Sequence, residues 1–395
     1  MPATHHSDLC PLVLLTPHEQ RLRIDKVRER LAAGGLTHAL VTGNANKFYL
    51  TGRVFTGYIL ITPSDTTYYV RRPVELSGTN VVYMRKPEEL GLTLPELALE
   101  LDELPYSTTI RLCKAFATTR THNLSPLLMA ARAVKTAAEI ALLEESGRRQ
   151  DEVYGKIPSL FRPGMTDLEF QIEIERASRL AGCIGQFRIS GDSMELFMGN
   201  VLAGDNADSP SPYDFAMGGA GMNPSIPVGA DGTTMKPGMT VMVDVNGNYT
   251  GYMTDMTRDF RIGQVAEQAV RAHECSVEIH RRLSALGTPG TPASRLWEEA
   301  AETARSYHLE DYFMGHRQHA GFVGHGVGIE INELPVIAPR SKHLLEENNV
   351  IALEPKFVIP GTGAAGIENT YVVTPAGLRR ITNCTEQFID LESRE

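Results

Sequence analysis

The amino-acid sequence predicts a two-domain protein in which a smaller α/β domain precedes a larger domain of mixed strands and helices. The first observation is the length of 395 residues, which exceeds the roughly 100–200 residues of a typical domain. The second is that short strand and helix patterns alternate up to about residue 130. The third is a long helical pattern over residues 133–155, which we take as the start of the second domain. The predicted domains span residues 1–133 and 134–395.

Helical periodicity and turn residues predict the elements of the first domain. Apolar residues recur at helical spacing from Leu22 to Leu31, and Gly34-Gly35 ends the pattern, so a helix is expected over residues 17–35. Turn residues then separate short apolar runs that are typical of strands. The strands predicted in this way cover residues 38–41, 47–50, 58–61 and 67–70.

Longer strand patterns alternate with helices in the second domain. After the opening helix, three further helices are predicted at residues 167–181, 265–286 and 292–307. The segments between and beyond them have the apolar character of strands, and no short-period repeat is visible.

Composition excludes several classes of protein. The net charge is -10 and no run of Lys or Arg forms a basic stripe, so we expect no nucleic-acid partner. No apolar stretch approaches the ~20 residues that span a bilayer, and the run Leu12–Leu15 is too short for a signal peptide. The five cysteines are scattered and form no CxxC pair. We therefore expect a protein of the reducing cytoplasm, without membrane attachment.

Two aspartates follow strand patterns close together in the chain. An apolar run ends in Asp244, a turn is expected at residues 246–248, and a returning strand presents Asp255. A hairpin of this kind brings both carboxylates to one place. Each aspartate alone has an ordinary structural explanation, because Asp is common at strand ends and turns.

Three further residues suggest a common site with these aspartates. His325 lies between two glycines, which leave its imidazole unobstructed. Glu354 and Glu368 each interrupt an apolar strand pattern, so both carboxylates are expected to be buried. Moving an unpaired carboxylate from water into the protein interior costs on the order of several kcal/mol, even after the surrounding structure has relaxed. No lysine or arginine pattern supplies a partner for both glutamates, so the sequence predicts metal ions instead.

Four carboxylates and one imidazole are the ligands that Mn, Co, Fe or Zn accept, and they do not form a thiolate site. Two divalent ions would offset four negative charges, so we expect two divalent metal ions as cofactors. Such a centre polarises a carbonyl and supplies a nucleophile near neutral pH.

Together these motifs resemble the family of creatinase, prolidase, aminopeptidase P and methionine aminopeptidase. The order Asp, Asp, His, Glu, Glu is present over residues 140–395, and the segment Asn44–Gly52 is similar to the N-terminal domain of the prolidase and aminopeptidase P branch. The resemblance implies an α+β protein: a C-terminal pita-bread domain preceded by a smaller α/β creatinase-type domain. It also implies a homodimer that acts on small peptides as an Xaa-Pro-type metallopeptidase.

The resemblance also implies roles for the five residues. Asp244 would hold one ion, His325 and Glu354 the other, and Asp255 and Glu368 would bridge both ions. A bridging hydroxide would complete the site. Glu354 would in addition be the catalytic proton shuttle.

The sequence departs from the peptidase pattern at several positions. Val228 and Asn332 stand where the peptidases carry imidazoles, Gly366 where they carry Arg, Lys356 where they carry Gly, and Asn369 where they carry Asp. An imidazole that stabilises an oxyanion contributes about 10²–10³ in rate, so its absence predicts slow cleavage of ordinary peptides.

The candidate substrate-binding residues come from these departures and from residues 187–197. They are Val228, Asn332, Lys356 and Arg188, with Glu195, His316 and His319 as further possibilities. The Lys356 ammonium either replaces a missing imidazole or points to solvent on an edge strand, and we favour solvent. Asn332 either donates to substrate or fills space, and we favour the pocket.

Two alternatives to a peptidase stay open. The fold also hosts metal-dependent hydrolases and lyases of small non-peptide molecules, and some of its members only bind. Retention of five ligands that are costly to bury disfavours the binding member. Assays on Xaa-Pro peptides distinguish a peptidase from a hydrolase or lyase of small non-peptide molecules.

Overall fold

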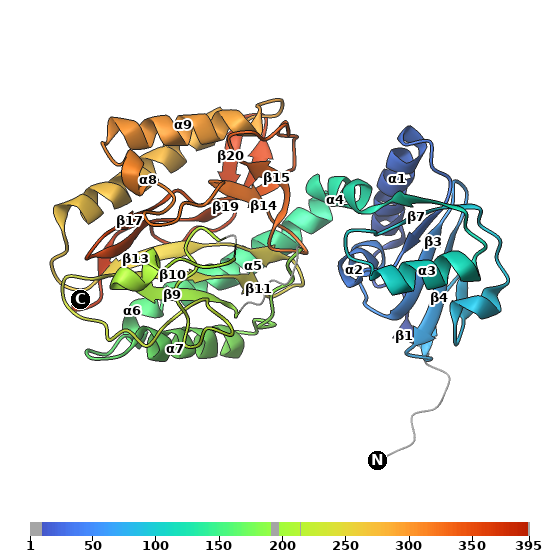
Figure 1. Cartoon of the computed structure of the whole chain (residues 1–395), viewed down its shortest axis with the longest axis horizontal. Coiled ribbons are helices and arrows are strands. Elements are labelled where there is room, and N and C mark those ends of the chain that lie inside the picture. Colours follow the sequence, from blue (N-terminus) through green and yellow to red (C-terminus); the bar gives the residue numbers. More distant parts are fainter. Residues whose placement is uncertain (1–9, 191–196, 214, 394–395) are drawn as a thin grey trace, which may run out of the picture. The chain divides into compact units, whose positions relative to one another are not determined.

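The computed structural model describes residues 10–190, 197–213 and 215–393. The chain forms two compact units, residues 1–132 and 133–395 (Figure 1). Each unit has its own strands and helices, and the mixed α+β composition expected for the second unit is found. Among the described residues, no helix is both long and apolar enough to cross a membrane.

The first unit is a six-stranded sheet with helices against it, in the strand order β6-β4-β3-β2-β7-β8. Leu40, Leu97 and Leu99 pack in its core with Phe116. Its helices are α1 (Pro17–Ala33), α2 (Asn44–Thr51), α3 (Tyr106–Ala115) and α4 (Ser125–Ala133). Its strands are β1 (Cys10–Pro11), β2 (Ala39–Val41), β3 (Thr56–Ile61), β4 (Thr66–Arg72), β5 (Leu76–Ser77), β6 (Val81–Tyr83), β7 (Glu96–Leu99) and β8 (Arg120–Asn123).

One predicted strand of this unit is wrong. Residues 47–50 lie in helix α2, which begins after Gly43 and ends at Gly52 in the left-handed conformation. A short apolar run fits a strand and a buried helix equally well, and the two flanking glycines decide for the helix here. The helix expected at residues 17–35 is confirmed as α1.

The second unit contains the four long helices that the sequence predicts, α5 (Ala137–Tyr154), α7 (Asp167–Leu180), α8 (Glu267–Leu286) and α9 (Ala293–Ser306). It also contains a short helix that was not predicted, α6 (Ile157–Leu160). Helix α4 ends at Ala133 and α5 begins after Thr136, whose hydroxyl accepts from the backbone N–H of Glu139 in a capping box. The predicted helix at residues 133–155 therefore starts about one turn later than expected.

Two larger sheets form the centre of the second unit, in the orders β21-β13-β10-β9 and β15-β14-β16-β19-β20. Helix α7 packs near β9, and α8 and α9 pack together on the other side of the strands (Figure 1). The strands are β9 (Gly199–Ala203), β10 (Thr240–Val245), β11 (Gly247–Asn248), β12 (Met253–Thr254), β13 (Thr257–Arg261), β14 (Gly324–Gly326), β15 (Glu333–Ile337), β16 (Val350–Leu353), β17 (Lys356–Ile359), β18 (Gly363–Gly366), β19 (Asn369–Thr374), β20 (Gly377–Arg380) and β21 (Ile389–Asp390).

The hairpin between the two aspartates differs from the predicted one. Gly247 and Asn248 do not form the turn but pair with Thr254 and Met253 as strand β11. A side chain on Gly247 would come within 2.6 Å of the Thr254 hydroxyl. The glycine is therefore needed for close packing of two strands, and the chain turns after it.

Candidate metal centre

Each of the five predicted ligands lies at or next to the end of a strand of the second unit, or within a short one. Asp244 lies near the end of β10, Asp255 directly after β12, and His325 in the middle of β14. Glu354 follows β16, and Glu368 lies between β18 and β19. Pairing of β10 with β13 brings the two aspartates near each other in one sheet, and pairing of β16 with β14 and β19 does the same for the other three residues in the second sheet. The ligand atoms of the two sets then meet at one place.

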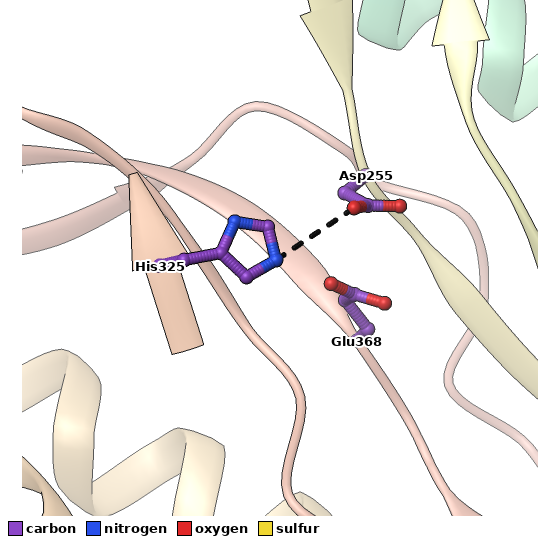
Figure 2. A group of neighbouring side chains, drawn as sticks. All are labelled: Asp255, His325 and Glu368. Atoms are coloured by element: carbon purple, nitrogen blue, oxygen red, sulfur yellow. Dashed lines mark ion pairs between the residues drawn. The ribbon is translucent and has the colours of Figure 1, made fainter. Parts of the chain in front are cut away.

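Two groups of ligand atoms meet in this centre. One joins Asp255, His325 and Glu368, and the other joins Asp244, Glu354 and Glu368; within each group the ligand atoms lie within 4.8 Å of one another. Figure 2 shows the first group, whose three side chains converge from separate segments of the chain. His325 Nε2 lies 3.9 Å from Asp255 Oδ2 and 3.4 Å from Glu354 Oε1.

The first group suits a divalent ion. His325 Nδ1 lies 3.0 Å from the Gly326 carbonyl oxygen, so Nδ1–H donates there and Nε2 faces the carboxylates. Glu368 is 1% exposed, and its Oε1 accepts no hydrogen bond from any described residue. A buried carboxylate oxygen without a donor is costly, and a metal ion would satisfy it.

The second group already contains a cation. Lys356 Nζ lies 2.9 Å from Asp244 Oδ2, 2.9 Å from Glu354 Oε2 and 3.3 Å from Glu368 Oε2. Lys356 is 0% exposed, so the expectation that it points to solvent is wrong. The expectation that no lysine serves both glutamates is wrong for the same reason. An ammonium has three N–H donors, and all three are used by these carboxylates.

The charges of the surrounding side chains affect the pKa values of the carboxyl groups in the two groups of ligand atoms differently. Although burial raises it, the charges of Lys356 and His325 lower the pKa of Glu354 to about 2. Burial, and next the Asp244 carboxylate, raise the pKa of Asp255 to about 7. Burial and Asp255 raise the pKa of Glu368 well above its ordinary value. The ionised form is thus stabilised at Glu354 and disfavoured at Asp255 and Glu368, although Lys356 also contacts one oxygen of Glu368.

The carboxylates are held by residues that the sequence did not single out. Thr257 Oγ1 donates to Glu368 Oε2 at 2.8 Å, and the buried Arg258 donates to the Glu368 carbonyl at 2.8 Å. Ser276 Oγ donates to the Pro355 carbonyl at 2.6 Å and accepts from Ile367 N–H at 2.9 Å. Thr257 and Arg258 directly follow Asp255-Met256, and their proximity to the ligand was the available signal.

The candidate substrate residues differ in what they contact. Asn332 Nδ2 donates to the Ser190 carbonyl at 2.6 Å and its Oδ1 accepts from Ser190 N–H at 2.8 Å. Its amide therefore holds the segment before residue 191. Val228 is buried, and the Arg188 carbonyl accepts from Ile331 N–H. Glu195 lies outside the described residues.

The two other histidines bond within their own surroundings. His316 Nδ1 lies 2.9 Å from Asp208 Oδ2, and His319 Nδ1 lies 2.9 Å from the Phe313 carbonyl oxygen. Both side chains are exposed. Neither belongs to the two groups of ligand atoms.

The matching family models fit this architecture. The model described as "Metallopeptidase family M24" matches residues 141–375. The chain belongs to metallopeptidase family M24. The model of the creatinase/prolidase N-terminal domain matches residues 23–134, so this M24 chain has the predicted N-terminal domain and the pita-bread domain.

Relatives of this M24 chain are named peptidases. An uncharacterised peptidase of Bacillus subtilis is 25% identical over 94% of this chain and 100% of its own length. An Xaa-Pro dipeptidase of Pyrococcus horikoshii is 24% identical over 93% of this chain and 98% of its own length. The solved prolidase of Pyrococcus horikoshii OT3 has the same fold, with a TM-score of 0.78 at 24% identity over 93% of this chain and 99% of that one.

Proposed function

We propose that the protein is a metal-dependent hydrolase of small amide substrates, with Xaa-Pro dipeptides as the first class to test. The observation that carries this proposal is the convergence of Asp255, His325 and Glu368 with an unsatisfied buried carboxylate oxygen. The names of the M24 relatives supply the substrate class. A divalent ion held by these side chains would polarise the scissile carbonyl and activate water.

The protein's own residues orient and enclose this chemistry. The Gly326 carbonyl fixes the tautomer of His325, and Thr257 and Arg258 fix Glu368. Glu354 stays the proposed proton acceptor, with one oxygen toward His325 and the other toward Lys356. Because Lys356 stabilises its carboxylate form, Glu354 is ionised and free to accept a proton, although the same contact makes it a weaker base.

A second candidate is a hydrolase of a small non-peptide amide. Val228 offers no side-chain donor, and the amide of Asn332 is occupied by Ser190. Neither position therefore supplies the donor that a peptide's tetrahedral intermediate needs. With Lys356 also fully paired, a small substrate whose oxyanion is stabilised by the metal alone would suit the site better.

The test compares kcat/KM for Xaa-Pro dipeptides and for simple N-acyl amides, with Mn or Co supplied and with chelator. Values near ~10⁴ M⁻¹s⁻¹ on dipeptides support the peptidase, and values far below that with cleavage of non-peptide amides support the second candidate. Asp255→Asn is the control that should abolish either activity. Absence of both activities in metal-loaded protein would contradict the proposal. The expected homodimer stays a prediction, which light scattering measures.

A further inference from the structure

The side chain of Lys356 is the one feature of the centre that a dinuclear site does not explain. Its ammonium is within hydrogen-bond distance of one oxygen each of Asp244, Glu354 and Glu368. These are the three residues of the second group of ligand atoms. A cation of the protein thus stands where an ion would need to bind.

Lys356 is fixed in this place by its strand. It pairs with Gly366 across the β17–β18 hairpin, and its carbonyl accepts from Met314 N–H at 2.8 Å. The whole residue is buried, so the side chain has no route to solvent without displacing its neighbours. Glu354 and Lys356 are two positions apart at the end of one strand and the start of the next, so their side chains extend from the same face.

The ammonium and a divalent ion compete for the same oxygens. A metal–carboxylate oxygen bond is about 2.0–2.2 Å long, so an ion bound by all three residues would be pressed against Nζ. Charges of the same sign repel strongly at such separation inside a protein. Lys356 would have to leave before an ion entered, and its three ion pairs oppose that.

The first group has the opposite character. Figure 2 shows Asp255, His325 and Glu368 directed toward one another. Lys356 Nζ bonds to Oε2 of Glu368, which also accepts from Thr257, whereas Oε1 accepts from no described donor. One carboxylate therefore turns one oxygen to the ammonium and the other to a position that lacks a cation.

We propose that this protein holds one divalent ion, at Asp255, His325 and Glu368, and that the Lys356 ammonium permanently takes the place of the second ion. The inference rests on the proposed function only in treating the first group as a metal site. It assigns Asp255 and one oxygen of Glu368 to the metal ion, and Asp244, Glu354 and the other oxygen of Glu368 to the Lys356 ammonium.

The experiment is to count ions in three forms of the full-length protein dialysed against Mn²⁺. Elemental analysis and native mass spectrometry should find one ion per chain in the wild type. Lys356→Ala removes both the charge and the stem, and should bind two ions. Lys356→Met removes the charge but keeps most of the volume, and should stay at one. The spin-coupled Mn signal of an ion pair should appear in Lys356→Ala alone.

Lys135→Met is the matched control. Lys135 Nζ lies 2.8 Å from Glu333 Oε2, and both side chains are buried as in the centre. This variant loses a buried ammonium elsewhere in the same unit, so its ion count should equal that of the wild type. If Lys356→Ala fails to fold, the wild-type count and an anomalous-scattering map of the wild-type crystal still decide.

Two ions in the wild type would overturn the inference and leave the proposed hydrolase intact. No ion in well-folded wild type would overturn both the inference and the metal dependence of the proposed function. One ion without cleavage of any amide would support the inference and contradict the proposed function.

Discussion

Gly366 lies opposite Lys356 in the β17–β18 hairpin, at a φ of 147° and without space for a side chain. A Cβ there would come within 2.5 Å of the Pro355 carbonyl oxygen and 2.9 Å of Lys356 Cα. The family resemblance predicts an arginine at this position, and the backbone found here cannot accommodate one. The glycine and the inward lysine therefore belong to one arrangement.

Replacing Gly366 with Ala should destabilise the second unit by about 2–4 kcal/mol, since it adds backbone strain to overpacking. Chemical denaturation measures the change. The control is Gly361→Ala, because Gly361 has a similarly unusual φ of 77° with nothing within 4 Å of the added atom. Equal effects of the two substitutions would show that crowding at Lys356 is unimportant.

Asp244 and Asp255 should respond differently to neutralisation. Asp255→Asn removes a ligand of the proposed ion, and we expect Mn²⁺ affinity to fall at least about 100-fold, more than for loss of a supporting contact. Asp244→Asn removes a partner of Lys356 and should lower the melting temperature while the ion stays bound. Isothermal titration with Mn²⁺ measures both. Loss of the ion in Asp244→Asn would argue for a ligand role of that residue.

His280 should make stability sensitive to acid. It is buried between the Tyr371 hydroxyl and the Ile367 carbonyl, and burial lowers its pKa to about 3 from an ordinary 6.5. Below pH 6.5 this histidine is protonated in the unfolded chain but stays neutral in the folded protein. The free energy of unfolding therefore falls as the pH falls from 6.5 toward 3. At pH 5.5, one unit below the ordinary pKa of histidine, the free energy of unfolding is lower by about 1.4 kcal/mol.

Comparing wild type with His280→Gln isolates this contribution, because other acid-sensitive groups are common to both proteins. Denaturation at pH 7.5 and pH 5.5 should show the smaller decrease in the variant. The same decrease in both proteins would mean that His280 is protonated in the folded state.

Asn332 should control the order of the segment that ends at Ser190. Asn332→Ala removes two hydrogen bonds to the Ser190 backbone, so hydrogen exchange of the Ser190 amide should rise markedly. Ile331 N–H, which donates to the Arg188 carbonyl, reports on the same contact. A variant with unchanged exchange but a raised KM would instead point to direct contact of Asn332 with substrate.

The five acidic and imidazole residues could be singled out from the sequence because each interrupts an apolar or glycine-rich pattern, and the structure brings their side chains together. Their role as metal ligands stays a prediction. The sequence also predicted α7, α8 and α9 closely, since their amphipathic patterns are long. Short elements were less certain. The run at residues 47–50 became a helix, and Gly247 became a strand residue, because close packing rather than local pattern decides such cases.

Lys356 was misjudged for a different reason. A lysine beside an apolar run is usually solvated, and its burial here depends on Asp244 and Glu368 from other strands as well as on the neighbouring Glu354. Only its spacing of two from Glu354 indicated a shared face. Thr257, Ser276 and His280 were missed because their contacts with the two glutamate segments join residues far apart in sequence.

A cation that is part of a side chain cannot be chelated, exchanged for another element or lost by dilution. Because the ammonium of Lys356 is covalently attached, one of the three positive charges proposed for the ammonium and the divalent ion is part of the chain and does not depend on the supply of metal in the cell. Scarcity of manganese or zinc would then remove only the remaining ion, and the carboxylates near Lys356 would stay in place to receive it again.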